Sequence, residues 1–405
     1  MSWLSGSSDF PKDHLPYGIF QLAPNDHRMC VPVGDLIVDL AACVDAGLLT
    51  SIGPQIARAG TLNPLIDLGP PTWQTLRDEL LLLVAADEEP APGLTHALNS
   101  AQLLVPVHVP DYVDFYSSIE HATNLGRLFR PDSEPLLPNW RHIPIAYHGR
   151  SGTIVASGTP ITRPVGQTRP PGDESPTFGP SKRLDIELEL GAILYRSPPG
   201  APVTVDQAEQ HIFGLVLVND WSARDIQAWE YQPLGPFLGK SFATTVGPWV
   251  VPFSSASRFR VDAPAQSPAP LEYLDSSDRQ NFDIHLNVAL QPDGAEQATV
   301  ITTTTSALLY WTFAQQIAHM TSNGAHLSSG DLIASGTISG SEPEAVGSLI
   351  ERTENAQRPM TIAGQSRTFL ADHDTVIIDG RLGGSTGPSM GQCIGTVRPS
   401  DRSNS

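Results

Sequence analysis

Alternating apolar and polar side chains predict that much of this chain forms β-strands. From Phe282 to Leu290 every second side chain is apolar, which is the period of a strand with one buried face. A Pro-Asp-Gly turn follows at 292–294, and the β-branched run 300–305 is predicted to be the hairpin partner. Another strand is predicted over 374–379.

Other segments follow different patterns. The run 212–218, IFGLVLV, is apolar throughout and predicts a strand that is buried on both faces. Helices are predicted over 73–86 and 310–320, and the stretch 163–180, rich in Pro and Gly, predicts a long loop. Together these elements indicate a mostly β fold with a few helices.

The beginning of the chain has a more uneven pattern than the rest. Short strand-like pieces at 18–21, 29–33 and 36–40 precede a helical segment, and the chain becomes strand-rich from about residue 105. We therefore expect an N-terminal domain over residues 1–105 and a C-terminal domain over residues 106–405.

Charge and cysteine content narrow the classes of partner. The 405 residues carry a net charge of −19, which disfavours binding to nucleic acid or to an anionic membrane. The three cysteines are far apart, without the spacing of a zinc site or a disulfide framework. The first ten residues show no basic and apolar leader, and no apolar run is long enough to cross a bilayer. These features predict a cytoplasmic protein.

An acidic pair within the segment LDIELEL, residues 184–190, is the first candidate for a functional site. Glu187 and Glu189 are two residues apart, so in a strand both side chains point to the same face. Adjacent carboxylates repel each other unless a cation lies between them, and hard divalent cations prefer such oxygen ligands. Taken alone, however, such a pair is more often a solvated face of an acidic protein.

A second polar group follows the apolar run. Four of its residues recur at the spacing of one helical face: Asp220, Arg224, Gln227 and Tyr231. Ser222 and Asp225 resemble a capping box at the start of this helix. By spacing alone an exposed helix face is the simpler interpretation. Lys240, which lies among glycines and aromatic residues, favours a site instead.

A third group lies earlier in the chain. Asp114, Tyr116 and His121 fall within eight residues, and Arg130 and Tyr147 follow. A histidine beside an acid and a phenol is a candidate general base, because its pKa lies near neutrality. The alternatives are a structural histidine and, for Tyr147, a simple turn.

Long motifs in these regions resemble the fumarylacetoacetate hydrolase family. They are DFPKDHLPYGIF (9–20), DFYSSIEHATN (114–124), LLPNWRHIPIAYHGR (136–150), LDIELEL (184–190), VNDWSARDIQAWEYQPLGPFLGKSFATT (218–245) and ASGTISGSEPEAVGS (334–348). The resemblance is weakest over 45–105 and 381–390. It implies a small SH3-like N-terminal barrel, a large C-terminal domain of mixed β-sandwich and β-roll type, and a homodimer.

The resemblance also implies roles for individual residues. The implied Ca²⁺ ligands are Asp114, Glu187, Glu189 and Asp220, although Mg²⁺ and Mn²⁺ accept similar ligands. A second cation, Mg²⁺, is implied near Asp220, Lys240 and Thr244. The implied catalytic groups are His121 as the base, Glu351 as its partner, and Arg224, Gln227 and Lys240 around an oxyanion. The implied substrate contacts are Tyr116, Arg130, Tyr147, Gln227, Tyr231 and Thr337.

The implied reaction is metal-dependent hydrolysis of the carbon–carbon bond of a β-diketo acid, fumarylacetoacetate, to fumarate and acetoacetate. This reaction ends tyrosine and phenylalanine catabolism. The nearest alternatives are an acylpyruvate hydrolase and an oxaloacetate decarboxylase, which share the acidic ligands. A non-catalytic metal-binding dimer is an alternative from another class. Four carboxylates, one divalent ion, Arg224 and Lys240 would sum to zero charge if they converge.

Overall fold

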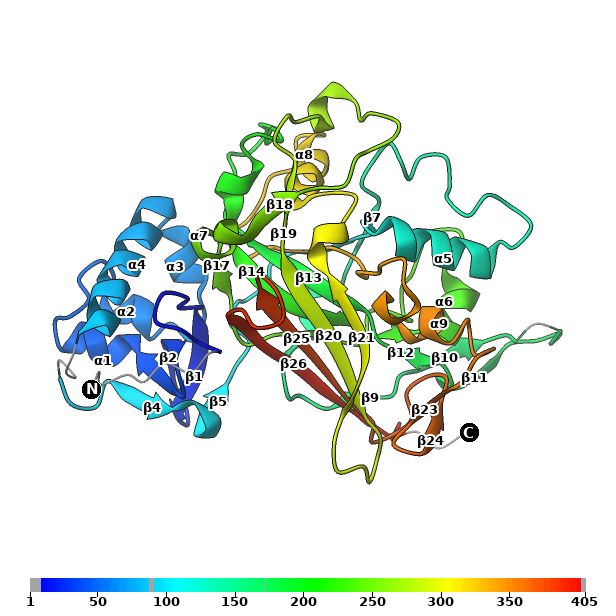
Figure 1. Ribbon diagram of the computed structural model, residues 1–405, viewed down its shortest axis with the longest axis horizontal. Coiled ribbons are helices and arrows are strands. Elements are labelled where there is room, and N and C mark those ends of the chain that lie inside the picture. The colour runs from blue at the N-terminus through cyan, green and yellow to red at the C-terminus, as the bar shows by residue number, and fades with distance from the viewer. Residues whose placement is uncertain (1–8, 87–90, 171, 402–405) are drawn as a thin grey trace.

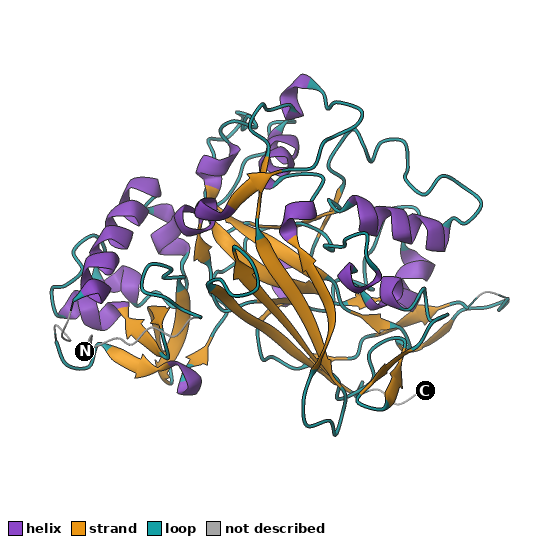
Figure 2. Ribbon diagram, viewed as in Figure 1, coloured by secondary structure: helices purple, strands orange, loops and turns teal. Residues whose placement is uncertain are grey.

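The structure is a computed structural model that describes residues 9–86, 91–170 and 172–401. Figure 1 shows the N-terminal region, in blue, beside a larger body that contains two curved sheets. The same view coloured by secondary structure shows that strands form the centre of this body and helices lie around it (Figure 2). The predicted mostly β fold class is confirmed. The first eight residues, where no leader is predicted, lie outside the described residues.

The larger sheet runs in the order β7-β6-β22-β13-β14-β16-β8, and β17 also pairs with β14. Its central strands are antiparallel, whereas β6 runs parallel to β22. The strand bounds are β6 Tyr112–Phe115, β7 Ala146–His148, β8 Ile154–Ala156, β13 Leu188–Leu194, β14 Ile212–Asp220, β16 Thr244–Val246, β17 Val251–Pro252 and β22 Leu332–Ala334.

The second sheet runs in the order β21-β20-β25-β26-β9. Its strands are β9 Ile161–Thr162, β20 Ile284–Gln291, β21 Thr299–Thr305, β25 Thr375–Leu382 and β26 Ser389–Arg398. β20 and β21 form the predicted hairpin, with His285 opposite Thr305. Leu286 and Val288 of this sheet pack with Leu215 and Leu217 of the larger sheet in one core. The two sheets therefore bury their apolar faces against each other.

The N-terminal region has a sheet in the order β4-β3-β2-β1-β5, where the resemblance implies an SH3-like barrel. These strands are β1 Gly18–Ala23, β2 Asp26–Val33, β3 Leu36–Asp39, β4 Thr95–Ala97 and β5 Gln102–Leu103. The helices beside them are α1 Leu40–Asp45, α2 Pro54–Ala57, α3 Asn63–Asp67 and α4 Pro70–Ala85. Two prolines begin α4, where a missing N–H is tolerated.

The N-terminal region shares a core with the larger sheet. Phe213, Val216 and Val218 of β14 lie in one apolar cluster with Val31 of β2 and Leu76 of α4. The other face of β14 belongs to the core between the two sheets. Each face of this strand therefore packs on apolar side chains, which explains why its sequence is apolar throughout. A domain boundary near residue 105 stays a prediction.

The remaining helices and short strands lie around the two sheets (Figure 2). The remaining helices are α5 Ile119–Phe129, α6 Arg224–Glu230, α7 Phe253–Ala256, α8 Phe313–Thr321 and α9 Leu349–Arg352. The remaining strands are β10 Val165–Thr168, β11 Thr177–Pro180, β12 Leu184–Asp185, β15 Ser222–Ala223, β18 Arg260–Asp262, β19 Gln280–Phe282, β23 Met360–Ile362 and β24 Gln365–Arg367. Among the described residues, no helix is both long and apolar enough to cross a membrane.

Three local predictions are wrong. The segment 163–180 is not one long loop, because β10 and β11 pair as an antiparallel hairpin. The strand predicted over 184–190 is interrupted at 186–187, between β12 and β13. The predicted capping box at Ser222 does not form: Ala223 is the N-cap of α6, and the Ser222 hydroxyl donates to the carbonyl of Asp220.

Candidate active site

Four buried carboxylates converge at one end of the larger sheet. Asp114 lies on β6, Glu189 on β13, Asp220 at the end of β14, and Glu187 in the interruption before β13. Each offers an oxygen, and these oxygens lie within 4.8 Å of one another. The interrupted strand thus still places Glu187 and Glu189 together. Because like charges at this separation repel strongly, the cluster requires compensating cations.

One side of the acidic cluster lacks such compensation. Neither carboxylate oxygen of Glu189 has a hydrogen-bond partner among the described residues, and the same holds for Oδ1 of Asp114. Burial and the neighbouring charges of Asp114, Glu187 and Asp220 raise the pKa of Glu189 well above its usual range. Burial and Asp220 likewise raise the pKa of Asp114. Buried oxygens without donors are suitable ligands for a divalent metal.

The other side of the acidic cluster is neutralised by two cations. Arg224 Nη1 lies 2.8 Å from Glu187 Oε1, and Lys240 Nζ lies 2.6 Å from Asp220 Oδ2 and also contacts Glu187. Although burial alone favours the neutral acid, Lys240 and Arg224 lower the pKa of Glu187 to about 2. All six charged groups counted in the sequence converge, so one divalent cation would bring their nominal sum to zero.

Hydroxyl groups complete the Asp220 side of the cluster. The Tyr147 hydroxyl donates to Asp220 Oδ2 at 2.6 Å and to Asp114 Oδ2 at 3.2 Å. Thr244 on β16 donates to Asp220 Oδ1 at 3.3 Å. Although burial disfavours the charged amine, Asp220 and Glu187 raise the pKa of Lys240, so its ammonium group stays protonated. Its side chain is therefore a poor base and a poor metal ligand.

A buried histidine–carboxylate pair lies beside the acidic cluster. His121 on α5 and Glu351 on α9 are joined by a contact of 2.6 Å from Nδ1 to Oε2. On its opposite side, His121 Nε2 lies 3.9 Å from Glu187 Oε1. Burial disfavours the Glu351 carboxylate, but His121, Ser348 and Asn124 hold its pKa below the usual value. A carboxylate on Nδ1 favours the neutral tautomer whose Nε2 lone pair faces the cluster.

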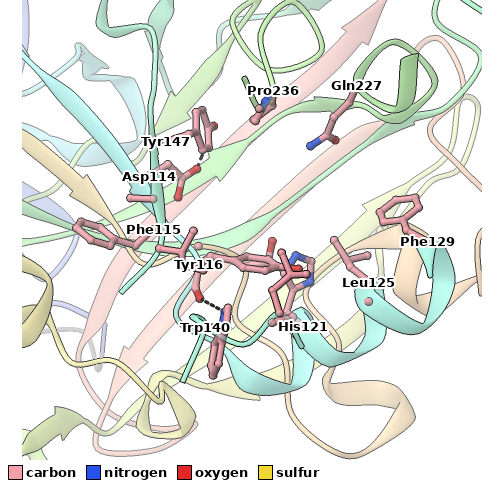
Figure 3. A pocket seen from close by; sticks show the side chains of 18 of the residues that line it. Asp114, Phe115, Tyr116, His121, Leu125, Phe129, Trp140, Tyr147, Gln227 and Pro236 are labelled. Carbon is pink, nitrogen blue, oxygen red and sulfur yellow. Dashed lines mark hydrogen bonds between the residues drawn. The ribbon is translucent and has the colours of Figure 1, made fainter. Parts of the chain in front are cut away.

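A cavity of about 370 Å³ connects these two groups. Figure 3 shows His121 and Gln227 approaching it from opposite sides, on α5 and α6. The predicted residues that line it are Asp114, Tyr116, His121, Arg130, Tyr147, Glu187, Arg224, Gln227, Lys240 and Thr337. Arg130 Nε and Thr337 Oγ1 are buried without a hydrogen-bond partner in the described part of the chain. Both are thus available to polar atoms of a ligand.

Tyr231 is the predicted substrate contact that the structure leaves apart. It is 40% exposed at the C-terminal end of α6 and, in the described part of this single chain, does not line the cavity. Its hydroxyl accepts a hydrogen bond from the neighbouring Gln232.

Several residues that hydrogen-bond to the predicted site residues were not predicted from the sequence. Glu351 accepts hydrogen bonds from Asn124 at 2.9 Å, Ser339 at 3.0 Å and Ser348 at 2.7 Å. Asp185 pairs with Arg224 at 2.8 Å and is fully buried. One signal for Asp185 was present, since it has the same parity as Glu187 and Glu189 in LDIELEL.

The chain matches two family models in sequence order. The fumarylacetoacetate (FAA) hydrolase C-terminal model matches residues 112–398, and the fumarylacetoacetase N-terminal model matches residues 13–109. The chain belongs to the fumarylacetoacetate hydrolase family. The matched C-terminal segment contains the four carboxylates and the His121–Glu351 pair.

Relatives within this family match almost end to end. The chain is 44% identical to the fumarylacetoacetase of Arabidopsis thaliana over 413 residues, which covers 98% of this chain and 97% of that protein. It is 45% identical to the fumarylacetoacetase of Rattus norvegicus and 44% identical to that of Homo sapiens, each over 405 residues and 97% of both chains.

Solved structures share the fold at low identity. A fumarylacetoacetate hydrolase from Exiguobacterium antarcticum aligns with a TM-score of 0.54 and 18% identity, covering 95% of this chain and 99% of that one. A maleylpyruvate hydrolase from Sphingobium aligns with a TM-score of 0.52 and 16% identity, covering 95% of this chain and 100% of that one. At this identity the likeness concerns the fold alone.

Proposed function

We propose that this protein hydrolyses the carbon–carbon bond of fumarylacetoacetate to give fumarate and acetoacetate, as the last step of tyrosine and phenylalanine catabolism. One observation carries the proposal: His121 of the histidine–carboxylate pair lines the same cavity as Asp114 and Glu187 of the four-carboxylate cluster. The curated relatives with this activity match 97% of the chain or more.

The general base is His121. It takes a proton from water at Nε2, while Glu351 orients the ring through Nδ1 and stabilises the imidazolium that forms. The hydroxyl adds to the carbonyl next to the scissile bond. When that bond breaks, its electron pair stays on the acetoacetate carbon, which then takes a proton. Base catalysis of this kind typically contributes roughly 10²–10⁴-fold.

Three donors face the oxyanion that forms when hydroxide adds. Arg224, Gln227 and Lys240 all line the cavity, and the two cations among them keep their charge. One such donor is worth about 3 kcal/mol in a water-excluded site. Tyr116, Arg130, Tyr147 and Thr337 line the rest of the cavity and are assigned to substrate binding. Tyr231 is assigned there only by resemblance.

The proposed cofactor is Ca²⁺, with Mg²⁺ or Mn²⁺ as alternatives. It would be held by Asp114, Glu187, Glu189 and Asp220, and the unpartnered oxygens of Glu189 support this assignment. When bound, the cation supplies Lewis-acid stabilisation of negative charge on the diketone oxygens. A second site, for Mg²⁺, is proposed at Asp220, Lys240 and Thr244. There Lys240 would contribute its backbone oxygen, because its ammonium group cannot ligate.

We also propose a cytoplasmic homodimer that binds neither nucleic acid nor membranes. Leu234, Phe237 and Leu238, beside the cavity, are at least 50% exposed, and apolar groups of this size often mark an interface. Light scattering on the purified protein tests the dimer, and a monomeric mass would contradict it.

A substrate panel tests the reaction. With Ca²⁺ present, the purified protein is incubated with fumarylacetoacetate, an acylpyruvate and oxaloacetate, and fumarate, acetoacetate and pyruvate are quantified. We expect turnover of fumarylacetoacetate to exceed that of the others. Preference for an acylpyruvate or for oxaloacetate would contradict the proposal, and so would a metal-loaded protein that turns over none of the three.

A further inference from the structure

A fully buried carboxylate behind the cavity joins the two parts of the proposed active site. Asp185 Oδ1 accepts hydrogen bonds from the backbone N–H groups of Ile186 at 2.8 Å and Leu349 at 2.7 Å. Its Oδ2 accepts from Arg224 Nε at 2.8 Å and from the N–H of Ile350 at 3.1 Å. These four donors use the four acceptor positions of a carboxylate. Asp185 is not among the described residues that line the cavity, so it is not placed to touch substrate.

On one side Asp185 holds Arg224. The bond to Nε orients the planar guanidinium so that Nη1 reaches Glu187 at 2.8 Å. Nη2 is buried without a hydrogen-bond partner in the residues that the structure describes, and Arg224 lines the cavity. A guanidinium is rigid and planar, so fixing one edge determines where the other donors point.

On the other side Asp185 holds the start of α9, which carries Glu351. This helix is a single turn, Leu349–Arg352, too short to be stable on its own. The first N–H groups of a helix lack partners within it. The N-cap residue, Ser348, makes no side-chain cap bond, and its hydroxyl donates to Glu351 instead. Asp185 therefore caps α9 from 164 residues away in the sequence.

We propose that Asp185 is a positioning residue that holds Arg224 and Glu351 in a fixed mutual arrangement, so that the oxyanion donor and the base pair face the same substrate carbonyl. The inference rests on the proposed function. A merely structural ion pair would change the amount of folded protein, whereas a positioning residue also changes the turnover of the protein that is folded.

The first test is Asp185→Asn, which keeps size and shape. The amide has one acceptor oxygen, so its NH₂ group must face either Arg224 and the N–H of Ile350, or the N–H groups of Ile186 and Leu349. In both cases α9 loses one of its two bonds to residue 185. We expect kcat per folded molecule to fall by roughly 10–100-fold, with KM within about threefold of wild type. The matched control is Asp225→Asn on α6, because Asp225 also accepts backbone N–H groups, from Lys182 and Ile226, together with the Ser181 hydroxyl. In the described part of the chain its carboxylate bonds neither to the Arg224 guanidinium nor to α9. Its kcat should stay within about twofold.

A double-mutant cycle tests whether Asp185 acts through Glu351. If it does, the combined loss in Asp185→Asn/Glu351→Gln is smaller than the product of the single losses by roughly fivefold or more. Losses that multiply within about twofold would overturn the inference, as would an Asp185→Asn variant with wild-type kcat. The cycle with Asp225→Asn should show no coupling.

A second variant guards against misfolding of Asp185→Asn. Replacing Leu349 by its α-hydroxy acid analogue converts the amide to an ester, which deletes the N–H that Asp185 accepts and keeps every side chain. The ester also makes the Ser348 carbonyl a weaker acceptor for the N–H of Arg352. We expect kcat to fall and KM to stay, and an unchanged kcat in this folded protein would overturn the inference. If the wild type turns over no fumarylacetoacetate, the proposed function fails, and the positioning role fails with it. An active wild type with unaffected variants refutes the positioning role alone.

Discussion

Two buried carboxylates near the cavity, Glu351 and Glu189, differ in how their charge is compensated. Glu351 is surrounded by donors from His121, Asn124, Ser339 and Ser348, and its pKa is lowered. Glu189 is equally buried, yet both of its oxygens lack a hydrogen-bond partner among the described residues, and its pKa is raised.

This difference indicates that Glu351 already has its hydrogen-bond donors, whereas Glu189 lacks them and is suited to bind a cation. A buried carboxylate with all its acceptors used contributes to stability and holds its neighbour in place. A buried carboxylate without donors destabilises the fold until a cation binds. The histidine–carboxylate pair is therefore organised without a ligand, whereas the acidic cluster could bind a divalent ion that supplies the missing positive charge.

The largest expected effect is a loss of activity without a loss of metal binding. His121→Ala removes the base but leaves all four carboxylates in place. We expect hydrolysis of fumarylacetoacetate to fall by roughly 10²–10⁴-fold, while Ca²⁺ affinity by calorimetry stays close to wild type. Near-full activity in this variant would remove His121 from the base role.

Glu189→Gln removes one carboxylate charge from the acidic cluster. We expect Ca²⁺ affinity to fall by at least roughly 10-fold, because a ligand charge is lost, and activity to fall with it. The metal-free variant should be more stable than the metal-free wild type by about 1–3 kcal/mol, because the wild type must either bury an unpaired charge or protonate Glu189 on folding. Denaturant unfolding with and without chelator measures both, and unchanged Ca²⁺ affinity would exclude Glu189 as a ligand.

Glu351→Gln makes the corresponding change in the histidine–carboxylate pair. The amide nitrogen would replace either Oε2, which accepts from His121, Ser339 and Ser348, or Oε1, which accepts from Asn124. One set of bonds is lost in either case, so we expect the variant to lose about 1–3 kcal/mol of stability whether or not metal is present. Calcium affinity should change little. If chelated Glu351→Gln and Glu189→Gln shift in the same direction, the contrast between the two carboxylates is wrong.

The last effect appears only below pH 6.5 and concerns a buried histidine that, among the described residues, has no hydrogen-bonded carboxylate. His14 Nε2 contacts the Ser389 carbonyl at 2.8 Å, and burial lowers the pKa of His14 to about 4. The unfolded chain then binds the proton more readily, so this contribution to stability is complete above pH 6.5 and is lost between pH 6.5 and about 4. The total is roughly 3 kcal/mol. Denaturant unfolding of His14→Gln should show a flatter pH dependence than wild type, and an equal slope would contradict the assignment.

Much of the fold followed from side-chain periodicity. Alternation predicted the β20–β21 hairpin, and the apolar run of β14 predicted burial on both faces. The β10–β11 hairpin was missed because its pairing depends on backbone groups in a stretch where Pro and Gly suggest a loop. The SH3-like barrel predicted for the N-terminal region came from the family resemblance alone, since the short strands there carry little periodicity. The structure shows a sheet in the order β4-β3-β2-β1-β5 in that region.

Site residues could be predicted where the type and spacing of side chains indicate their role. Period two placed Glu187 and Glu189 together even though the strand is interrupted between β12 and β13. Asp185 was missed because two of its partners are backbone N–H groups in α9, and a backbone donor leaves no mark in the sequence. Tyr231 lies apart because α6 ends at Glu230, and Tyr231 at its C-cap is exposed to solvent.

We expect a divalent ion in the acidic cluster to be required for carbon–carbon bond hydrolysis in the adjoining cavity. The most direct test follows the loss of fumarylacetoacetate absorbance by the wild type before chelation, after chelation with residual metal measured by mass spectrometry, and after addition of Ca²⁺, Mg²⁺ or Mn²⁺. We predict that activity disappears with the metal and returns with at least one of these ions. Undiminished hydrolysis by fully metal-free protein would contradict the account.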